Sequence, residues 1–310
     1  MKTVFMGTPD FSVGTLEAIL EAGHEVAAVV TQPDKPKGRG KAMQATPVKE
    51  AALAHGLTVF QPARIREPGF QEELKKINPD VIVVVAFGQI IPKTILELPR
   101  YGCINVHASL LPCYRGAAPI QWAVINGDEV SGVTIMRMDA GLDTGDMLSK
   151  VEVPLAADET GGSLFDKLSE AGARQLVLTL AELERGTLQP EKQPEESPTE
   201  YARMITKADG EIDWTKDAVT LERLIRGLNP WPSAFTHLEG KTLKIWKASV
   251  RELDSKETAG TVISSGKDGL IVQTGQGQLQ ILELQLEGKK RMETDAFLRG
   301  YSVQEGTVLA

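Results

Sequence analysis

The sequence has few cysteines, no long apolar run and no excess of positive charge. Cys103 and Cys113 are its two cysteines in 310 residues, too few for a disulfide framework, which is typical of a reducing cytoplasm. No stretch reaches the roughly 20 apolar residues that cross a bilayer, so we expect no membrane-spanning helix. The opening MKTVFMGTPDF carries one lysine before a short apolar run and a turn. It predicts a first strand rather than a signal peptide.

Several common site signatures are also missing. A net charge of −8 argues against broad, non-specific binding of nucleic acid, so any such contact is expected to be local. The segment GTPDFSVG is neither GxGxxG nor a Walker motif, and a tight turn into a helix explains it more simply. The histidines lack the spacing of a metal site, and no metal is expected; they are His24, His55, His107 and His237.

Short Val- and Ile-rich runs alternate with helical patterns up to about residue 186. Strands are predicted at 2–6, 25–31, 57–60, 80–87, 103–109, 132–138 and 147–155, and helices at 11–22, 47–55, 70–77 and 163–186. Most of the runs are continuous enough for strands covered on both faces. The pattern therefore predicts an α/β domain over residues 1–188, a Rossmann-like, doubly wound and mostly parallel sheet.

The pattern changes after this domain. Residues 189–204 are acidic and proline-rich, which predicts a linker. Residues 205–310 hold one expected helix, at 217–227, followed by short strands separated by glycine turns. This pattern indicates a small, mostly β domain, an OB-like β-barrel.

Asn105 and His107 stand two residues apart at the end of a predicted strand, so their side chains share one face. In open α/β sheets, ligands bind beyond the carboxyl ends of the strands. An amide can stabilise a developing oxyanion, and an imidazole can do so when protonated or can move a proton. Taken alone, the Asn-x-His pair is better explained as a polar strand end with a satisfied histidine.

A loop with three aspartates, MDAGLDTGDML, joins the next two predicted strands. Asp139, Asp143 and Asp146 are ordinary turn residues unless one of them meets His107. An aspartate placed there would orient the ring and favour its charged form. Together, an Asn, a His and an Asp form an acyl-transfer site whose nucleophile must come from the substrate.

The long segment NVHASLLPCYRGAAPIQWAVINGD, followed by GVTIMRMDAGLDTGDML, resembles the folate-dependent formyltransferases. MGTPDFSV, VVVAFGQIIP and GLNPWPSAF extend the resemblance along the chain. The resemblance implies that the catalytic residues are Asn105, His107 and Asp143. It also implies a folate site formed by Phe87, Gly88, Gln89, Ile90, Ser109, Leu110, Leu111 and Pro112.

The resemblance further implies a reaction between 10-formyltetrahydrofolate, as co-substrate, and initiator methionyl-tRNA. The free α-amine of the methionine would attack the formyl carbon, giving formylated initiator tRNA for translation in the cytoplasm. Asn105 and His107 would hold the oxyanion, and Asp143 would fix His107. Organic groups supply the stabilising charge, so no metal is needed, and no protein partner is implied.

Positive charges cluster in the segment PDKPKGRGKAMQATP. With Lys49 just beyond this segment, residues 31–49 hold five positive charges against Asp34 alone. The four positive residues within the segment are Lys35, Lys37, Arg39 and Lys41. A solvated surface loop is the ordinary explanation of such a run. In the resembled family this loop enters the acceptor arm of the tRNA, so the resemblance implies tRNA binding by these four residues.

Two other functions remain open at this point. A sugar-nucleotide formyltransferase would share the catalytic core, but it has no reason to carry the basic loop. A non-catalytic module that binds folate or RNA would require the three candidate catalytic residues to be coincidental.

Overall fold

The computed structural model describes residues 1–37, 42–266 and 269–310. This part of the chain forms two compact units, each of which is described by itself below. Unit 1 comprises Met1–Pro119, Val130–Pro154 and Phe165–Ala202, and unit 2 comprises Ile120–Glu129, Leu155–Leu164 and Arg203–Ala310. Two short segments from earlier in the chain, Ile120–Glu129 and Leu155–Leu164, thus group with the C-terminal part. The expected domain ranges, 1–188, 189–204 and 205–310, stay a prediction.

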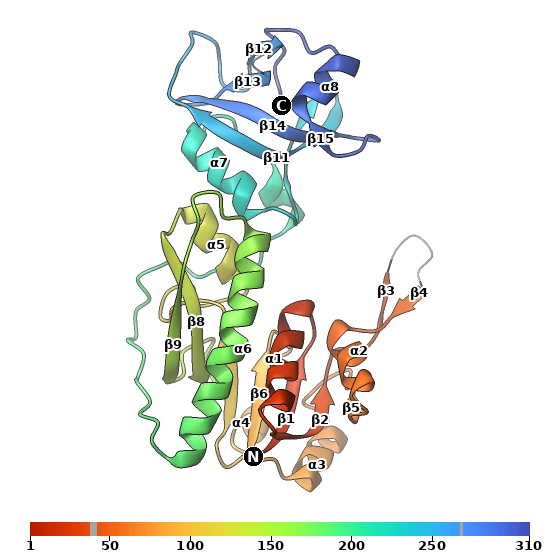
Figure 1. The fold of residues 1–310 in the computed structure, drawn as a ribbon, viewed down its shortest axis with the longest axis vertical. Helices are drawn as coiled ribbons and strands as arrows, with labels where there is room; N and C mark the ends of the chain where they lie inside the picture. The colour runs from red at the N-terminus through yellow and green to blue at the C-terminus, as the bar shows by residue number, and fades with distance from the viewer. Residues whose placement is uncertain (38–41, 267–268) are drawn as a thin grey trace. The chain divides into compact units, whose positions relative to one another are not determined.

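Unit 1 is built on a seven-stranded sheet with the order β5-β2-β1-β6-β7-β8-β9 (Figure 1). Its strands are β1 (Lys2–Gly7), β2 (Glu25–Val30), β5 (Val59–Phe60), β6 (Val81–Val85), β7 (Cys103–His107), β8 (Val130–Arg137) and β9 (Met147–Pro154). The first five pair in parallel, whereas β8 and β9 are antiparallel to their neighbours. The predicted doubly wound, mostly parallel sheet is therefore confirmed. Its strand order reverses between β1 and β6.

Helices cover both faces of this sheet, which explains why all five residues of β6 are buried. The helices are α1 (Asp10–Glu21), α2 (Pro47–Ala54), α3 (Pro68–Ile77), α4 (Lys93–Leu96) and α6 (Gly161–Arg185). On one face, Ser169 of α6 donates a 3.0 Å hydrogen bond to the carbonyl of Phe11 in α1. On the other face, Leu74 of α3 and Ile95 of α4 share an apolar core with the strands.

Gly172 allows α6 to lie directly on the strand that carries the candidate site. A Cβ atom at this position would come within 2.8 Å of a Val106 methyl on β7 and 3.3 Å of a Val133 methyl on β8. The distance to Val106 is too short for two carbon atoms, so a larger residue would push α6 away from β7.

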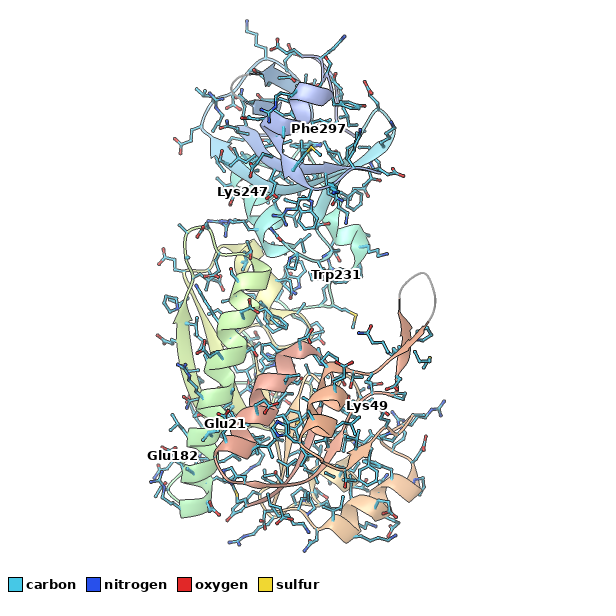
Figure 2. The ribbon with its side chains drawn as sticks, turned by 45° about the vertical axis from the view of Figure 1, so that its right-hand side comes forward. Glu21, Lys49, Glu182, Trp231, Lys247 and Phe297 are labelled. Atoms are coloured by element: carbon cyan, nitrogen blue, oxygen red, sulfur yellow. The ribbon has the colours of Figure 1, made fainter. Side chains whose placement is uncertain are left out.

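Unit 2 carries an antiparallel sheet with the order β10-β11-β14-β13-β12, and β15 pairs with β14. Its strands are β10 (Ala234–Leu238), β11 (Lys241–Arg251), β12 (Val262–Gly266), β13 (Gly269–Gln273), β14 (Gln278–Leu286) and β15 (Met292–Glu293). The other elements are α5 (Pro119–Asn126), η1 (Lys207–Gly210), α7 (Ala218–Gly227) and α8 (Thr294–Gly300). Phe297 on α8 (Figure 2) is buried in the apolar core of these strands.

Residues 306–310 connect the two edges of this sheet. Val262 at the start of β12 donates a 2.8 Å backbone hydrogen bond to the carbonyl of Thr307. His237 in β10 donates one of the same length to Ala310. These bonds give both edge strands a further backbone partner. The predicted mostly β character of this part of the chain is confirmed as a set of antiparallel strands.

A small hairpin follows β2 in unit 1. Its strands, β3 (Lys35–Lys37) and β4 (Ala42–Gln44), pair antiparallel. Two of the residues expected to bind tRNA, Arg39 and Lys41, lie between them and outside the described residues.

Candidate active site

Asn105 and His107 lie on one face of β7, close to its carboxyl end. In the sheet, Asn105 pairs with Val84 of β6, and His107 pairs with Thr134 of β8. His107 is buried and Asn105 is half-buried. The Asn105 amide makes no side-chain hydrogen bond within the part of the chain that the structure describes. It is therefore available to a bound ligand.

Both nitrogens of the His107 ring face an acceptor. Nε2 lies 3.1 Å from the carbonyl oxygen of Tyr114, and because a carbonyl only accepts, Nε2 is the donor. Nδ1 lies 3.9 Å from Oδ1 of Asp143. This distance is longer than a hydrogen bond but within reach of an ion pair. The lone pair of the neutral ring thus points towards a carboxylate, and protonation of Nδ1 would create an ion pair.

The β8–β9 loop brings Asp143 to His107. The backbone of Asp143 has a φ of +55°, a left-handed conformation that aspartate tolerates better than most residues. Its Oδ2 accepts a 3.0 Å hydrogen bond from the backbone N–H of Gly116, which leaves Oδ1 for His107. Asp139 is used within the loop, where it accepts two local hydrogen bonds. Of the loop's aspartates, Asp143 is therefore the one that meets His107.

Gly145 fixes the path of this loop. A Cβ atom at Gly145 would lie 1.8 Å from the carbonyl oxygen of Arg137, at the end of β8. The obstacle is backbone, which cannot rotate away. Only glycine therefore allows the loop to approach β8 closely enough to present Asp143.

Ser109 and Leu111 shape the loop after β7 from inside. Ser109 donates a 2.6 Å hydrogen bond from Oγ to the carbonyl of Cys113. Leu111 packs in a small buried cluster with two methionines. Leu110 and Pro112 are half-buried. Leu110 and Pro112 are therefore the two side chains of this loop that are more accessible to a folate. The assignment of residues 109–112 to the folate site stays a prediction.

The other expected folate segment follows β6. Gly88 has a φ of +82°, a region that favours glycine. Phe87 is buried, whereas Ile90 is 73% exposed. Gln89 ties the segment to the turn before α3, because its Oε1 accepts a 2.8 Å hydrogen bond from the backbone of Ile65. The result is a fixed turn that offers an apolar side chain to a flat ligand, and its folate contacts also stay a prediction.

A cavity of about 450 Å³ opens beside this turn. It is lined by Gln32, Ala63, Arg64, Arg66, Gly88, Gln89 and Ile90. Arg64 and Arg66 are exposed, and neither guanidinium has an ion-pair partner among the described residues. The cavity therefore suits a ligand with an anionic group. Neither arginine can be recognised from the sequence, because isolated basic residues in a loop form no motif.

The basic loop is partly described. Lys35 is exposed in β3, and Lys37 is the last residue of that strand. Their tRNA contacts, like those of Arg39 and Lys41, stay predictions.

Lys49 on α2 (Figure 2) does not add to this basic cluster. Its Nζ lies 2.7 Å from Oδ2 of Asp34, and Gln61 donates a second hydrogen bond to the same carboxylate. The hydrogen bond from Lys49 holds the pKa of the Asp34 carboxyl below its usual value. The base of the loop is thus electrically neutral, and its positive charge lies within residues 35–41.

Cys103 is not a reactive thiol, and the described residues hold no cluster of metal ligands. Burial raises the pKa of the Cys103 thiol to about 12, which keeps it protonated at neutral pH. No three His, Cys, Asp or Glu side chains of the described chain gather as metal ligands would. In the same residues, no helix has the length and apolar character to cross a membrane.

The arrangement suits transfer of an acyl group to a nucleophile that a substrate provides. A free amide and a histidine beside a carboxylate can stabilise an oxyanion. The Ser109 hydroxyl, the nearest candidate nucleophile in sequence, already donates to a backbone carbonyl. Gln193 and Thr199 also carry no signal in the sequence, although they contact the loop of Asp143 and the loop that follows His107.

Comparisons with known proteins agree with this chemistry. A family model described as formyl transferase matches residues 1–180, and one described as formyl transferase, C-terminal domain, matches residues 204–302. A methionyl-tRNA formyltransferase of Agathobacter rectalis is 64% identical over 307 residues, with 99% of each chain covered. Another of that name, from Lachnospira eligens, is 60% identical and covers 100% of this chain and 99% of its own.

Solved structures share the fold at much lower identity. An N-formyltransferase of Helicobacter canadensis, in complex with folinic acid and dTDP-3-aminofucose, has a TM-score of 0.65 at 18% identity, covering 91% of this chain and 99% of its own. HypX of Aquifex aeolicus, in complex with tetrahydrofolic acid, has a TM-score of 0.63 at 18% identity, covering 96% and 47%. At such identities the likeness concerns the fold alone.

Proposed function

The chain belongs to the formyl transferase family, and on that basis we propose that it transfers a formyl group from 10-formyltetrahydrofolate to the α-amine of methionyl-tRNA. The product is formylated initiator tRNA for translation, which places the reaction in the cytoplasm. Relatives that carry this function in their names match the whole chain at 64% and 60% identity.

One observation carries the chemical part of the proposal. At the end of β7, a half-buried Asn105 amide without a protein partner among the described residues lies on the same strand face as His107. Asp143 faces that histidine at 3.9 Å. A preorganised donor next to a charge-stabilised imidazole is what a developing oxyanion requires.

The reaction begins when the α-amine of the methionyl ester attacks the formyl carbon. A C–N bond forms, and the carbonyl electrons move to oxygen. The Asn105 amide and the positive charge of protonated His107 stabilise this oxyanion, while the Asp143 carboxylate stabilises the imidazolium. The intermediate collapses by breaking the bond to N10 of the folate, which takes up a proton as the attacking amine loses one. Each oxyanion donor contributes a factor of about 100 to 1,000 in rate.

The site residues divide between the two substrates. The turn with Phe87, Gly88, Gln89 and Ile90 and the loop of residues 109–112 hold the folate, whose formyl group reaches Asn105. The tRNA is drawn to the positive charge of residues 35–41, since the chain as a whole is acidic.

A substrate comparison tests the proposal. Purified protein is supplied with 10-formyltetrahydrofolate and either methionyl-tRNA or an amino-sugar nucleotide, and formylated product is measured. We expect transfer to methionyl-tRNA only. Transfer only to the amino sugar would favour a sugar-nucleotide formyltransferase, and folate binding without any turnover would favour a binding module.

A further inference from the structure

Residues 191–202, called the strap here, lie against the loop that carries Asp143 and against the loop that follows β7 and His107. At one end, Glu191 and Met147 exchange two backbone hydrogen bonds of 2.8 Å. At the other end, the backbone N–H of Ala202 donates a 2.8 Å hydrogen bond to the carbonyl of Arg115. The acidic, proline-rich composition predicts a loose linker, but the strap is bonded to the rest of unit 1 at both ends.

Gln193 is the buried polar residue of the strap, with 6% of its surface exposed. Its Nε2 donates hydrogen bonds to the carbonyl oxygens of Asp143, at 2.9 Å, and Gly145, at 2.7 Å. Its Oε1 accepts from Nε and Nη2 of Arg115, at 3.1 and 3.0 Å. The amide thus joins the backbone of the Asp143 loop to the loop after β7.

Thr199 acts on the surroundings of His107, the other member of the Asp143–His107 pair. Its Oγ1 accepts a 2.6 Å hydrogen bond from the backbone N–H of Tyr114. Tyr114 has a φ of +55°, a conformation that costs free energy for a tyrosine and needs support from its surroundings. The carbonyl of the same residue accepts the hydrogen bond from His107 Nε2. Thr199 therefore holds the residue that orients the His107 ring.

We propose that Gln193 and Thr199 are positioning residues for formyl transfer, which together set the spacing between Asp143 and His107. Gln193 holds the backbone of Asp143, and Thr199 holds the acceptor of His107 Nε2. Neither side chain needs to touch a substrate. This inference rests on the function proposed above and assigns a role to a segment that composition marks as a linker.

The geometry explains why the spacing needs such support. Asp143 and His107 interact through charge at 3.9 Å rather than through a hydrogen bond of their own. An ion pair fixes the orientation of its two groups weakly. The orientation must therefore come from the hydrogen bonds that Asp143 and His107 make to other parts of the protein. A displacement of about 1 Å in a catalytic group can cost about 100-fold in rate.

A matched pair of variants tests the Thr199 half. Thr199→Val keeps the shape of the side chain but removes the acceptor for the Tyr114 N–H, whereas Thr199→Ser keeps a hydroxyl. We expect kcat of Thr199→Val to fall about 10- to 100-fold while KM for 10-formyltetrahydrofolate is unchanged. Thr199→Ser should retain a kcat near that of the wild type.

A second pair tests the Gln193 half. Gln193→Glu keeps an acceptor for Arg115 but replaces the donor that faces the carbonyls of Asp143 and Gly145. We expect a loss in kcat similar to that of Thr199→Val. Glu196→Ala, a change at an exposed residue of the same strap, is the control and should be unchanged.

Rates are expressed per folate-binding site, counted by calorimetric titration, so that partial unfolding does not imitate a slower reaction. Absence of formyl transfer by the wild-type protein would refute the proposed function itself. If the wild type is active, a normal kcat in both Thr199→Val and Gln193→Glu would overturn the positioning role. The positioning role would also be overturned if the loss of kcat disappeared once the rates are expressed per folate-binding site.

Discussion

Asp143 and His107 face each other at 3.9 Å, between Oδ1 and Nδ1, while the remaining polar atom of each group is already bonded. Oδ2 of Asp143 accepts from Gly116, and Nε2 of His107 donates to Tyr114. Each group is thus held by a hydrogen bond to the backbone, and the interaction between Oδ1 and Nδ1 depends on charge. This distinguishes the pair from a catalytic dyad held together by its own hydrogen bond.

Removing the charge of Asp143 therefore removes its function. Asp143→Asn keeps an oxygen that can accept from Gly116, so the loop should stay in place and the melting temperature should change little. We expect kcat to fall by about 100- to 10,000-fold. Asp139→Asn, in the same loop, is the control and should stay active. Equal activity of the two variants would contradict the assignment of Asp143.

Asn105→Ala and His107→Ala should lose turnover and keep folate affinity. Their interactions strengthen only as the oxyanion forms, so they act on the transition state rather than on the ground state. We expect kcat of Asn105→Ala to fall by about 100- to 1,000-fold. Single-turnover formyl transfer and calorimetric titration with the folate measure the two quantities. A matching loss of folate affinity would assign Asn105 to binding instead.

The sequence reveals the part of this site that depends on local pattern. Alternation along β7 places Asn105 and His107 on one face, and the structure has them on that strand. The loop between β8 and β9 is marked by its glycines and acids. Which acid is used depends on the φ of Asp143 and on its bond to Gly116, 27 residues away in sequence, and neither leaves a pattern in composition.

Contacts between distant segments could not be predicted from the sequence. Gln193 is one polar residue in an acidic, proline-rich segment, and its partners are backbone carbonyls 50 and 48 residues earlier. Such bonds place no requirement on the partner's side chain, so nothing in the sequence marks them. A strand as short as β15, with two residues, shows no hydrophobic period and cannot be predicted from the sequence either.

Gly145→Ala should damage the site through the backbone. Its Cβ atom would lie 1.8 Å from the carbonyl oxygen of Arg137, so the loop must move and Asp143 with it. We expect a lower melting temperature and a loss of kcat comparable to that of Asp143→Asn. Gly141→Ala is a control, because its contact falls on the exposed side chain of Thr144, which can rotate. Thermal denaturation and initial rates of both variants provide the measurement.

Asp209 should make the stability of unit 2 depend on acid pH. Arg203 donates to both carboxylate oxygens, and Thr206 adds two hydrogen bonds, which together hold the pKa of Asp209 well below its usual value. A carboxyl with a depressed pKa stabilises the fold above its unfolded pKa of about 4, and this contribution is lost as pH falls towards the folded pKa.

The melting temperature of the wild type should therefore drop as pH falls from about 4 to about 2, more steeply than that of Asp209→Asn. Asp209→Asn should be a few degrees less stable than the wild type at neutral pH. Asp158→Asn, at an exposed aspartate, is the control and should follow the wild type. Parallel curves for the wild type and Asp209→Asn would show that the pair with Arg203 contributes no pH-dependent stability.

The basic loop should control the use of tRNA and leave folate binding alone. The chain has a net charge of −8, so a polyanion must be attracted to a local positive feature. The pairing of Lys49 with Asp34 leaves that feature to residues 35–41. Each phosphate bound by a basic side chain releases counterions, which gives a log–log salt slope of about −0.7 to −0.9 per phosphate.

Changing Arg39 and Lys41 together to alanine should lower kcat/KM for methionyl-tRNA and flatten its salt dependence by about 0.7–0.9 for each phosphate that is no longer bound. Folate affinity should not change, because the expected folate residues follow β6 and β7 rather than β3. A double alanine variant of Lys75 and Lys76 on α3 removes the same charge elsewhere and is the control. The measurement is kcat/KM for methionyl-tRNA over a range of salt concentrations. Equal slopes for the two double variants would mean that the loop is an ordinary solvated turn, and would favour an acceptor smaller than tRNA.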